Sequence, residues 1–239
     1  MVEVAALHPQ DAENAQAGGA DRLHVFRVVG DEMLTLEPSA VSAIVRATDL
    51  PVRVTLRLSG GFTTQGGEFS RLAGLVTDYL SQGVEGFVFG FLTPDLEVDV
   101  AVCAALAGAL ASAPWAFDRA FDHALDARRA WRHVRRLPGL DGIHTAGSVL
   151  GLASGLEDLL DLAESDPAFA WTAVAAGGLH AEAVPWLVRA GVTKIHLGAS
   201  VRPGGSWTKA HVDPAFVRSW RLLLDSAVDH QRGLSPQAG

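Results

Sequence analysis

Apolar and polar residues alternate strictly along the segment from residue 52 to residue 58. Valine and leucine occupy the even positions, whereas Arg53, Thr55 and Arg57 occupy the odd positions between them. Successive side chains of a β-strand point to opposite faces, so the pattern predicts a strand with one aliphatic face and one face that carries two guanidinium groups. The direction of the charged face depends on the architecture around the strand.

Strand-like segments of this kind recur along most of the chain and alternate with segments of helical periodicity. The strand candidates are Val2–Leu7, Arg22–Phe26, Val52–Leu58, Gly86–Leu92, Trp115–Arg119, Gly142–Ala146, Trp171–Ala176 and Thr193–Leu197. The helix candidates are Ser39–Ala47, Arg71–Gln82, Val100–Leu110, Ala127–Arg136, Leu156–Ala163, Ala181–Ala190 and Pro214–Val228. Most successive strands start roughly 25 to 30 residues apart, which is the length of one parallel strand-and-helix unit.

Eight such units predict a single-domain (β/α)₈ TIM barrel, which typically needs about 250 residues. An α/β fold with a doubly wound open sheet is the alternative. The expected barrel domain covers residues 1–232. The remaining residues, 233–239, are expected to form a disordered C-terminal tail.

In a barrel, the aliphatic face of the segment 52–58 packs under the helices, so its polar face points inward. The same parity predicts an interior with further ionisable side chains, namely Glu3, His24, Asp118, His144, Lys194 and His196. Burying unpartnered charges costs several kcal/mol each, so these groups are expected to pair, to bind a ligand or to line the open mouth.

One interpretation is that these charges form a structural ion-pair network that neutralises the interior. Its members would be Glu3, Asp118, Arg53, Arg57 and Lys194. Lys194 is expected to pair with Glu3 across the first and last strands of the closed barrel. Because a buried amine surrounded by cations is nucleophilic, a Schiff-base enzyme that uses Lys194 is a further alternative.

Composition narrows the class of protein. Apolar residues make up 49% of the chain and the formal net charge is −8, which favours a large core and argues against a nucleic-acid-binding surface. The single cysteine, Cys103, excludes a disulfide within the chain. No apolar run is long enough to span a bilayer, and no charged-then-apolar leader follows Met1, so a cytoplasmic protein without a membrane partner is expected.

Glycine clusters follow three of the predicted strands. Gly60 and Gly61 come after Arg57, Gly177 and Gly178 end the seventh strand, and Gly198 ends the eighth. Exposed backbone amides at these places hold phosphate in many barrels, so the glycines are candidates for cofactor or anion binding. Plain glycine turns are the alternative.

Four motifs together resemble the CutC family, which is named for copper homeostasis. They are Gly19-Ala-Asp-Arg-Leu23, Leu56-Arg57 with Gly60-Gly61, Phe117-Asp-Arg-Ala-Phe-Asp122 and Ile195-His196. The resemblance runs from Glu3 to about Ser200. It implies a TIM barrel, a cytoplasmic location, a homodimer and a role in copper handling or copper binding.

The chain departs from the family pattern where the family carries thiols. Val4, Ala5 and Ala6 follow Glu3 where the family has cysteines, and Phe26 replaces another cysteine. Cu(I) favours thiolate and thioether ligands. Cys103 lies in an apolar helical run and is expected to be buried and inert.

Other metal ligands are available at the expected mouth of the barrel. His24 and His196 are the candidate metal ligands, with Glu3, Asp118, Asp122 and His144 close by in the predicted fold. Imidazole with carboxylate suits zinc, iron, nickel or Cu(II). His8 and His211 are expected to be surface residues.

Two functional hypotheses lead. The first is copper binding or copper homeostasis, which the family resemblance alone implies. The second is an enzyme that acts by acid–base chemistry on a small anionic or phosphorylated metabolite, with Arg57 and the glycine loops holding the anion. Its candidate catalytic residues are Glu3, Arg57, Asp118, Arg119, Asp122 and His196. The sequence leaves open which hypothesis holds and whether the protein is an enzyme.

Overall fold

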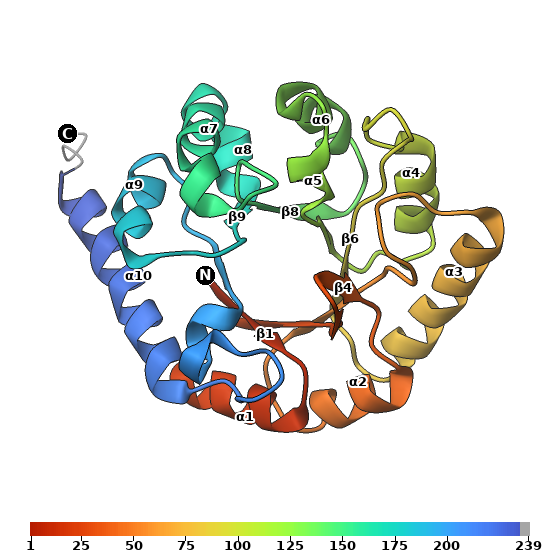
Figure 1. Ribbon diagram of the computed structural model, residues 1–239, viewed down its shortest axis with the longest axis horizontal. Helices are drawn as coiled ribbons and strands as arrows, with labels where there is room; N and C mark the ends of the chain where they lie inside the picture. The colour runs from red at the N-terminus through yellow and green to blue at the C-terminus, as the bar shows by residue number, and fades with distance from the viewer. Residues whose placement is uncertain (235–239) are drawn as a thin grey trace.

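The eight main strands of the protein are parallel and close into a barrel. A computed structural model describes residues 1–234, and Figure 1 shows helices forming a ring around the strands. The order around the barrel is β1-β10-β9-β8-β7-β6-β5-β2, so each neighbour in the sheet is a neighbour among the barrel strands in sequence. The closed barrel confirms the predicted TIM-barrel fold over the open sheet.

The barrel strands are short. They are β1 (Val2–Ala6), β2 (Arg22–Val25), β5 (Val52–Thr55), β6 (Gly86–Phe89), β7 (Trp115–Phe117), β8 (Leu140–Thr145), β9 (Ala173–Ala175) and β10 (Ile195–Leu197). A separate antiparallel hairpin of β3 (Arg27–Val29) and β4 (Glu32–Leu34) follows β2.

Ten α-helices and three short 3₁₀ helices connect the strands within residues 1–234. The α-helices are α1 (Pro9–Gly18), α2 (Pro38–Val45), α3 (Gly66–Ser81), α4 (Val100–Gly108), α5 (Ala120–His123), α6 (Ala127–Val134), α7 (Leu152–Ser165), α8 (Pro167–Thr172), α9 (Val184–Arg189) and α10 (Pro214–Leu234). The 3₁₀ helices are η1 (Ala181–Ala183), η2 (Ala199–Val201) and η3 (Pro203–Gly205).

The inward and outward faces of the strands follow the sequence alternation. Val52 and Val54 belong to the hydrophobic core that the helices cover. Arg53, Thr55 and Arg57 are buried on the opposite face, inside the barrel. The alternation therefore identifies which side chains fill the barrel interior.

The predicted strand Trp171–Ala176 is wrong at its beginning. Trp171 and Thr172 are the last residues of α8, and β9 starts only at Ala173. Asp166 caps this helix by accepting a hydrogen bond from the amide of Ala168 at 2.9 Å, and Pro167 occupies its first turn. This start signal explains the helix, because an N-cap aspartate followed by proline favours helix initiation.

Helix α1 and the β3–β4 hairpin were not among the predicted elements. The buried face of α1 is made mainly of small side chains, such as Ala12 and Ala15. Small buried residues give a weak hydrophobic period, so the sequence pattern does not stand out. Gly18 ends this face, and a Cβ there would lie 2.5 Å from the Cβ of Val217 on α10.

Helix α10 completes the ring of helices between α9 and α1 (Figure 1). It continues to Leu234, so the first two residues of the expected tail are helical, and residues 235–239 lie outside the described residues. In the described part of the chain, no helix combines the length and the apolar character that crossing a membrane requires.

Candidate functional site

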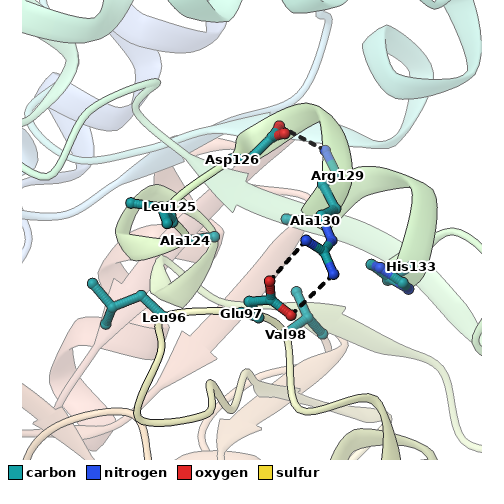
Figure 2. Close-up of a pocket in the computed structure, with 9 residues that line it drawn as sticks. All are labelled: Leu96, Glu97, Val98, Ala124, Leu125, Asp126, Arg129, Ala130 and His133. Carbon is teal, nitrogen blue, oxygen red and sulfur yellow. Dashed lines mark hydrogen bonds and ion pairs between the residues drawn. The ribbon is translucent and has the colours of Figure 1, made fainter.

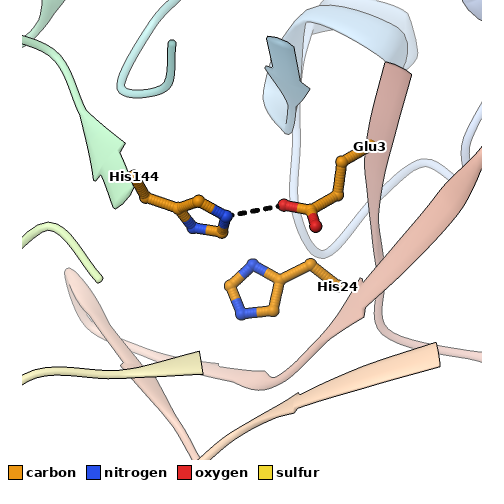
Figure 3. Close-up of side chains that lie close together, drawn as sticks. All are labelled: Glu3, His24 and His144. Carbon is orange, nitrogen blue, oxygen red and sulfur yellow. Dashed lines mark ion pairs between the residues drawn. The ribbon is translucent and has the colours of Figure 1, made fainter. Parts of the chain in front are cut away.

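Four ionisable side chains meet at the axis of the barrel. Glu3 comes from β1, His24 from β2, His144 from β8 and His196 from β10, and all four are buried. The strand register places Glu3 beside His196, and it places His24 on the neighbouring strand. We call these four residues the axial cluster; Figure 3 shows how Glu3, His24 and His144 point toward one another.

Glu3 is held by a cation on one side and an imidazole on the other. Its Oε2 accepts a hydrogen bond from Nε of Arg22 at 2.5 Å. Its Oε1 lies 2.8 Å from Nε2 of His144. That second contact does not have hydrogen-bond geometry, and neither atom has another hydrogen-bonding partner among residues 1–234. One carboxylate oxygen and one ring nitrogen are thus buried without a well-formed hydrogen bond, which is costly unless a ligand completes them.

The other two imidazoles are linked to each other. Nδ1 of His24 lies 3.2 Å from Nε2 of His196, and Nε2 of His24 lies 2.8 Å from Oγ1 of Thr55. The ring centroids of His24, His144 and His196 are 5.1 to 5.2 Å apart in every pair. Three rings at this spacing are close enough to approach one metal ion, since metal–nitrogen distances are about 2.0–2.1 Å.

The environment keeps Glu3 ionised and favours the neutral forms of His24 and His196. Burial opposes the charge of Glu3, but Arg22 and His144 outweigh burial and hold the pKa of Glu3 well below its usual range. Burial, together with the neighbouring imidazole of His144, lowers the pKa of His24 well below its ordinary value and that of His196 to about 4. At neutral pH the carboxylate of Glu3 is therefore anionic and the imidazoles of His24 and His196 keep a lone pair, which are the ligand forms that metal ions bind.

The donor set of the cluster matches that of a metal site. A carboxylate oxygen of Glu3 and one ring nitrogen each of His24 and His144 all lie within 4.8 Å of one another. Thiolate is not available here, because Cys103 is buried within α4 and burial raises the pKa of its thiol to about 12. The residues fit a metal that accepts nitrogen and oxygen ligands, and they do not fit a thiolate site for Cu(I).

A cavity of about 380 Å³ leads to the axial cluster. His24, His144 and His196 lie along its lining. Its lining carries three acids and two arginines, namely Asp31, Glu32, Asp118, Arg57 and Arg119. This balance favours a cation or a neutral molecule over an anion.

Arg57 lies at the cavity but is already engaged by protein groups. It forms an ion pair with Asp118 and donates to the carbonyls of Gly61 at 2.6 Å and Gly90 at 3.1 Å. Its guanidinium also packs over the ring of Phe62 at 4.3 Å. A bound anion would have to compete with the Asp118 carboxylate for this cation.

Arg119 and Asp122 form a second pair beside the cavity. Nε of Arg119 donates to Asp122 at 2.8 Å, and Asp122 also accepts from Oγ1 of Thr145 at 2.6 Å and from the amide of Ala146. Asp122 is fully buried in these contacts, whereas Arg119 lines the cavity. The pair fastens α5 to the end of β8.

The glycine clusters have packing roles in the structure. A Cβ on Gly177 would lie 2.9 Å from Cζ of Arg119, and a Cβ on Gly198 would lie 2.6 Å from the ring of Trp207. Trp207 thus occupies the space beside the eighth strand end where a phosphate was expected.

The remaining glycines of the predicted anion loops have more open surroundings, since a Cβ on Gly61 or Gly178 would meet no atom within 4 Å. Gly61 has a positive φ of 79°, and its amide donates to Glu32 at 3.3 Å. Gly60 faces the Glu32 side chain, and Gly178 has a positive φ of 88°. Glycine is required at Gly61 and Gly178 by backbone conformation, since other residues rarely adopt these angles.

The predicted pairing of Lys194 with Glu3 is wrong. Nζ of Lys194 contacts the backbone carbonyl of Asp141 at 3.3 Å and lies 5.5 Å from the ring centroid of Trp171. The register aligns Glu3 with His196, so Lys194 lies two positions nearer the amino end of the barrel. The expected single network also divides, because Arg53 pairs with Glu85 and Asp141 instead of Glu3.

Sequence reasoning missed Arg22, the cation that neutralises Glu3. Arg22 and His24 alternate with apolar residues on β2, so the same parity argument that identified His24 could have found it. Thr55, the partner of His24, was recognised only as an inward residue.

A second cavity of about 230 Å³ lies away from the barrel axis, between the loop after β6 and the segment that joins α5 to α6 (Figure 2). Leu96, Val98 and Ala130 contribute apolar walls. An ion pair of Glu97 and Arg129 at 2.8 Å crosses it. None of its lining residues belongs to the axial cluster.

Comparison with solved structures gives the same fold. The CutC protein from Streptococcus agalactiae, which carries the name of a copper homeostasis protein, is 19% identical with a TM-score of 0.74, and the match covers 83% of this chain and 97% of that one. Thiamine phosphate pyrophosphorylase from Pyrococcus furiosus is 16% identical with a TM-score of 0.60, covering 95% and 96%. A Pseudomonas aeruginosa protein that carries the name of a dihydrodipicolinate synthetase is 13% identical with a TM-score of 0.58, covering 98% and 79%.

At these identities the structural likeness shows the fold alone. No curated protein matches the chain. The sequence model of the CutC family matches residues 1–201, which is most of the chain and includes all four residues of the axial cluster. The chain therefore belongs to the CutC family.

Proposed function

We propose that the protein binds a divalent copper ion at the barrel axis through Glu3, His24 and His144, as its part in the copper homeostasis for which its family is named. One observation carries the proposal: a buried carboxylate oxygen and two buried imidazole nitrogens converge within 4.8 Å. In the same residues, Oε1 of Glu3 and Nε2 of His144 are buried without hydrogen-bond partners in the described part of the chain. A metal ion would satisfy both.

The choice of Cu(II) over Cu(I) follows from the ligands. Imidazole and carboxylate suit Cu(II), zinc and nickel, whereas Cu(I) prefers sulfur. Met33 is the one sulfur residue among those that line the cavity, and Cys103 is buried within α4. When bound, such an ion would supply Lewis-acid or one-electron chemistry; the protein residues supply the ligands, a closed pocket and an acidic entrance.

His196 supports the proposed ligands from the side. Its Nε2 lies 3.2 Å from Nδ1 of His24, which is the nitrogen of His24 left to bind a metal, because Oγ1 of Thr55 holds the ring at Nε2. Partners of this kind orient a ligand and typically change metal affinity by about 10- to 100-fold. His196 thus has a role either as a ligand or as a positioning residue.

The test is metal content and anaerobic Cu(I) and Cu(II) titration of tag-free protein. We expect Cu(II) binding at the axis, seen as one equivalent of Cu(II) per chain that Glu3→Gln and His144→Ala remove and that His196→Ala binds more weakly. His123→Ala is a matched control, because His123 lines the same cavity outside the axial cluster. Equal binding by all four variants and the unaltered protein would contradict the proposal.

A second candidate function is an acid–base enzyme, which the cavity itself favours. Its volume of about 380 Å³ suits a small metabolite, since ligand pockets typically measure about 300–1,000 Å³. His24, His144 and His196 line this cavity and could exchange protons with a bound molecule. The net negative lining and the engaged guanidinium of Arg57 favour a neutral or cationic substrate over the anionic one expected from the sequence.

Thermal-shift screening against phosphate esters, carboxylates and amines tests the enzyme hypothesis. A shift with an amine or a neutral metabolite that His144→Ala removes would support it. The absence of any shift across the three classes would argue against it.

The family resemblance further supports a cytoplasmic homodimer, which we include in the proposal. Light scattering of the purified protein at several concentrations measures the oligomeric state, and a monomer at all concentrations would contradict the dimer. Cell fractionation tests the location.

A further inference from the structure

Two histidines from opposite ends of the chain meet at the surface, outside the axial cavity. His8 is the N-cap residue of α1, and His211 lies just before α10. Their ring centroids are 5.7 Å apart with the rings nearly perpendicular at 81°. Both side chains are exposed, and neither lines the cavity that leads to the axial cluster.

A buried carboxylate orients one of the two rings. Oδ1 of Asp11 lies 3.2 Å from Nδ1 of His211. The same carboxylate accepts hydrogen bonds from Arg202 and from the amides of Leu7 and Val212, and it forms an ion pair with Arg202. An ionised carboxylate only accepts hydrogen bonds, so His211 donates through Nδ1 and keeps its lone pair on Nε2.

The backbone that carries the two histidines is firmly fixed. Asp11 forms a two-point ion pair with the fully buried Arg202, with contacts of 3.2 and 2.8 Å. Arg202 in turn donates to the carbonyls of Ala5 and Ala210. The amide of Val212 donates to Asp11 at 3.0 Å. These bonds join β1, the start of α1 and the segment before α10. They therefore fix the backbone positions of the two histidines relative to each other.

A carboxylate that accepts a hydrogen bond from one ring N–H of a histidine, while the other ring nitrogen is available, is the usual arrangement around a histidine that binds metal. A second imidazole stands beside this one. We propose that His8 and His211 form a surface site for a divalent transition metal that favours imidazole, such as Cu(II), Ni(II) or Zn(II), with Asp11 as the positioning carboxylate and water completing the coordination. This site is independent of the axial cluster.

Cu(II) titration of the tag-free double variant Glu3→Gln/His144→Ala tests the site, followed by calorimetry and by electron paramagnetic resonance of the bound ion. This background removes the proposed axial ligands. We expect one Cu(II) per chain to remain, with a nitrogen hyperfine pattern in its spectrum. Adding His8→Ala or His211→Ala is expected to lower its affinity at least about tenfold, the smallest effect typical of lost metal-site partners.

His230→Ala is the matched control, because it removes an exposed histidine elsewhere, on α10. Unchanged uptake in His8→Ala and His211→Ala, or an equal loss in His230→Ala, would overturn the proposal. If the double variant does not fold, the same three substitutions in the otherwise unaltered chain give the same comparison. Loss of all copper from Glu3→Gln/His144→Ala would also overturn the surface site, whereas loss of one of two equivalents is the expected effect of removing the axial ligands.

Discussion

Glu3 and Glu85 are both glutamates paired with an arginine inside or at the end of the same barrel, yet their surroundings differ. Glu85 pairs with Arg53 at 3.0 Å and its side chain is 39% exposed, whereas Glu3 pairs with Arg22 at 2.5 Å and is fully buried. Burial opposes the charge of Arg53, but Asp141 and Glu85 outweigh it and raise its pKa. The Arg53 network thus satisfies its charges within itself, and its two carboxylates are partly exposed to solvent.

The axial cluster is not closed in this way. Oε1 of Glu3 and Nε2 of His144 are near each other without a well-formed hydrogen bond. The comparison teaches that charge inside a barrel has two uses: the Arg53 network neutralises the interior, and the axial cluster keeps donor atoms available. Four measurements test this difference, from the largest expected effect to the smallest.

Glu3→Gln is expected to have the largest effect on stability. It leaves the Arg22 guanidinium without its buried counter-ion, and breaking a buried ion pair on one side typically costs about 3–5 kcal/mol. Denaturant unfolding of the metal-free protein measures the change. A loss of unfolding free energy below about 1 kcal/mol would mean that water solvates Arg22 and that Glu3 and Arg22 are not shielded from solvent.

Acidification is expected to destabilise the metal-free protein at the axis. The folded pKa of His196 is about 4, below the ordinary value of 6.5, so the unfolded chain binds a proton first as the pH falls. Stability should therefore decline between about pH 6.5 and pH 4, by about 3 kcal/mol for His196 alone, and His24 acts in the same direction.

The folded pKa of Glu3 is also lowered, so its contribution is present above the unfolded value of 4.5 and is lost as the pH falls through the folded value. Unfolding free energies at a series of pH values check both effects. A flat profile from pH 7 to pH 5 would contradict neutral buried histidines. His196→Asn should flatten the upper part of the profile.

Cu(II) is expected to stabilise the folded protein through the axial cluster. A ligand at 100 times its Kd adds about 2.7 kcal/mol when it binds only the folded state. Thermal unfolding with and without Cu(II) measures the gain, which should be smaller in Glu3→Gln/His144→Ala than in Arg53→Met, because only Arg53→Met keeps the axial ligands. Equal gains in both variants would place the stabilising metal outside the axis.

Glu85→Gln is expected to have the smallest effect, below about 1 kcal/mol, because the carboxylate is partly solvated and Asp141 still pairs with Arg53 at 2.5 Å. Denaturant unfolding alongside Glu3→Gln gives the direct contrast between the two layers. Equal losses in the two variants would remove the distinction drawn between them.

The sequence was informative where the position of a residue along a strand decides the direction of its side chain. Strict alternation in the segment 52–58 was enough to direct Arg53, Thr55 and Arg57 inward, because side-chain direction along a strand has a period of two. The number and spacing of the strands were enough for the closed barrel. The same parity argument brought Glu3, His24 and His196 to one interior.

The sequence did not show which residues would form contacts with one another. Lys194 was expected beside Glu3, but register aligns Glu3 with His196 instead, and register between strands depends on the packing of the whole barrel. Gly198 was expected to expose amides for phosphate, and only the folded chain shows the ring of Trp207 beside it. His8 and His211 were expected to be separate surface residues, and only the fold brings their rings together.

The sequence by itself determined the barrel, the polarity of its interior and the absence of thiols at its axis, since these depend on local period and residue type. The tertiary structure decided which charges pair, which nitrogen atoms remain without partners and how the ends of the chain meet. These features depend on distances between residues far apart in the chain, and such distances are set only when the barrel closes.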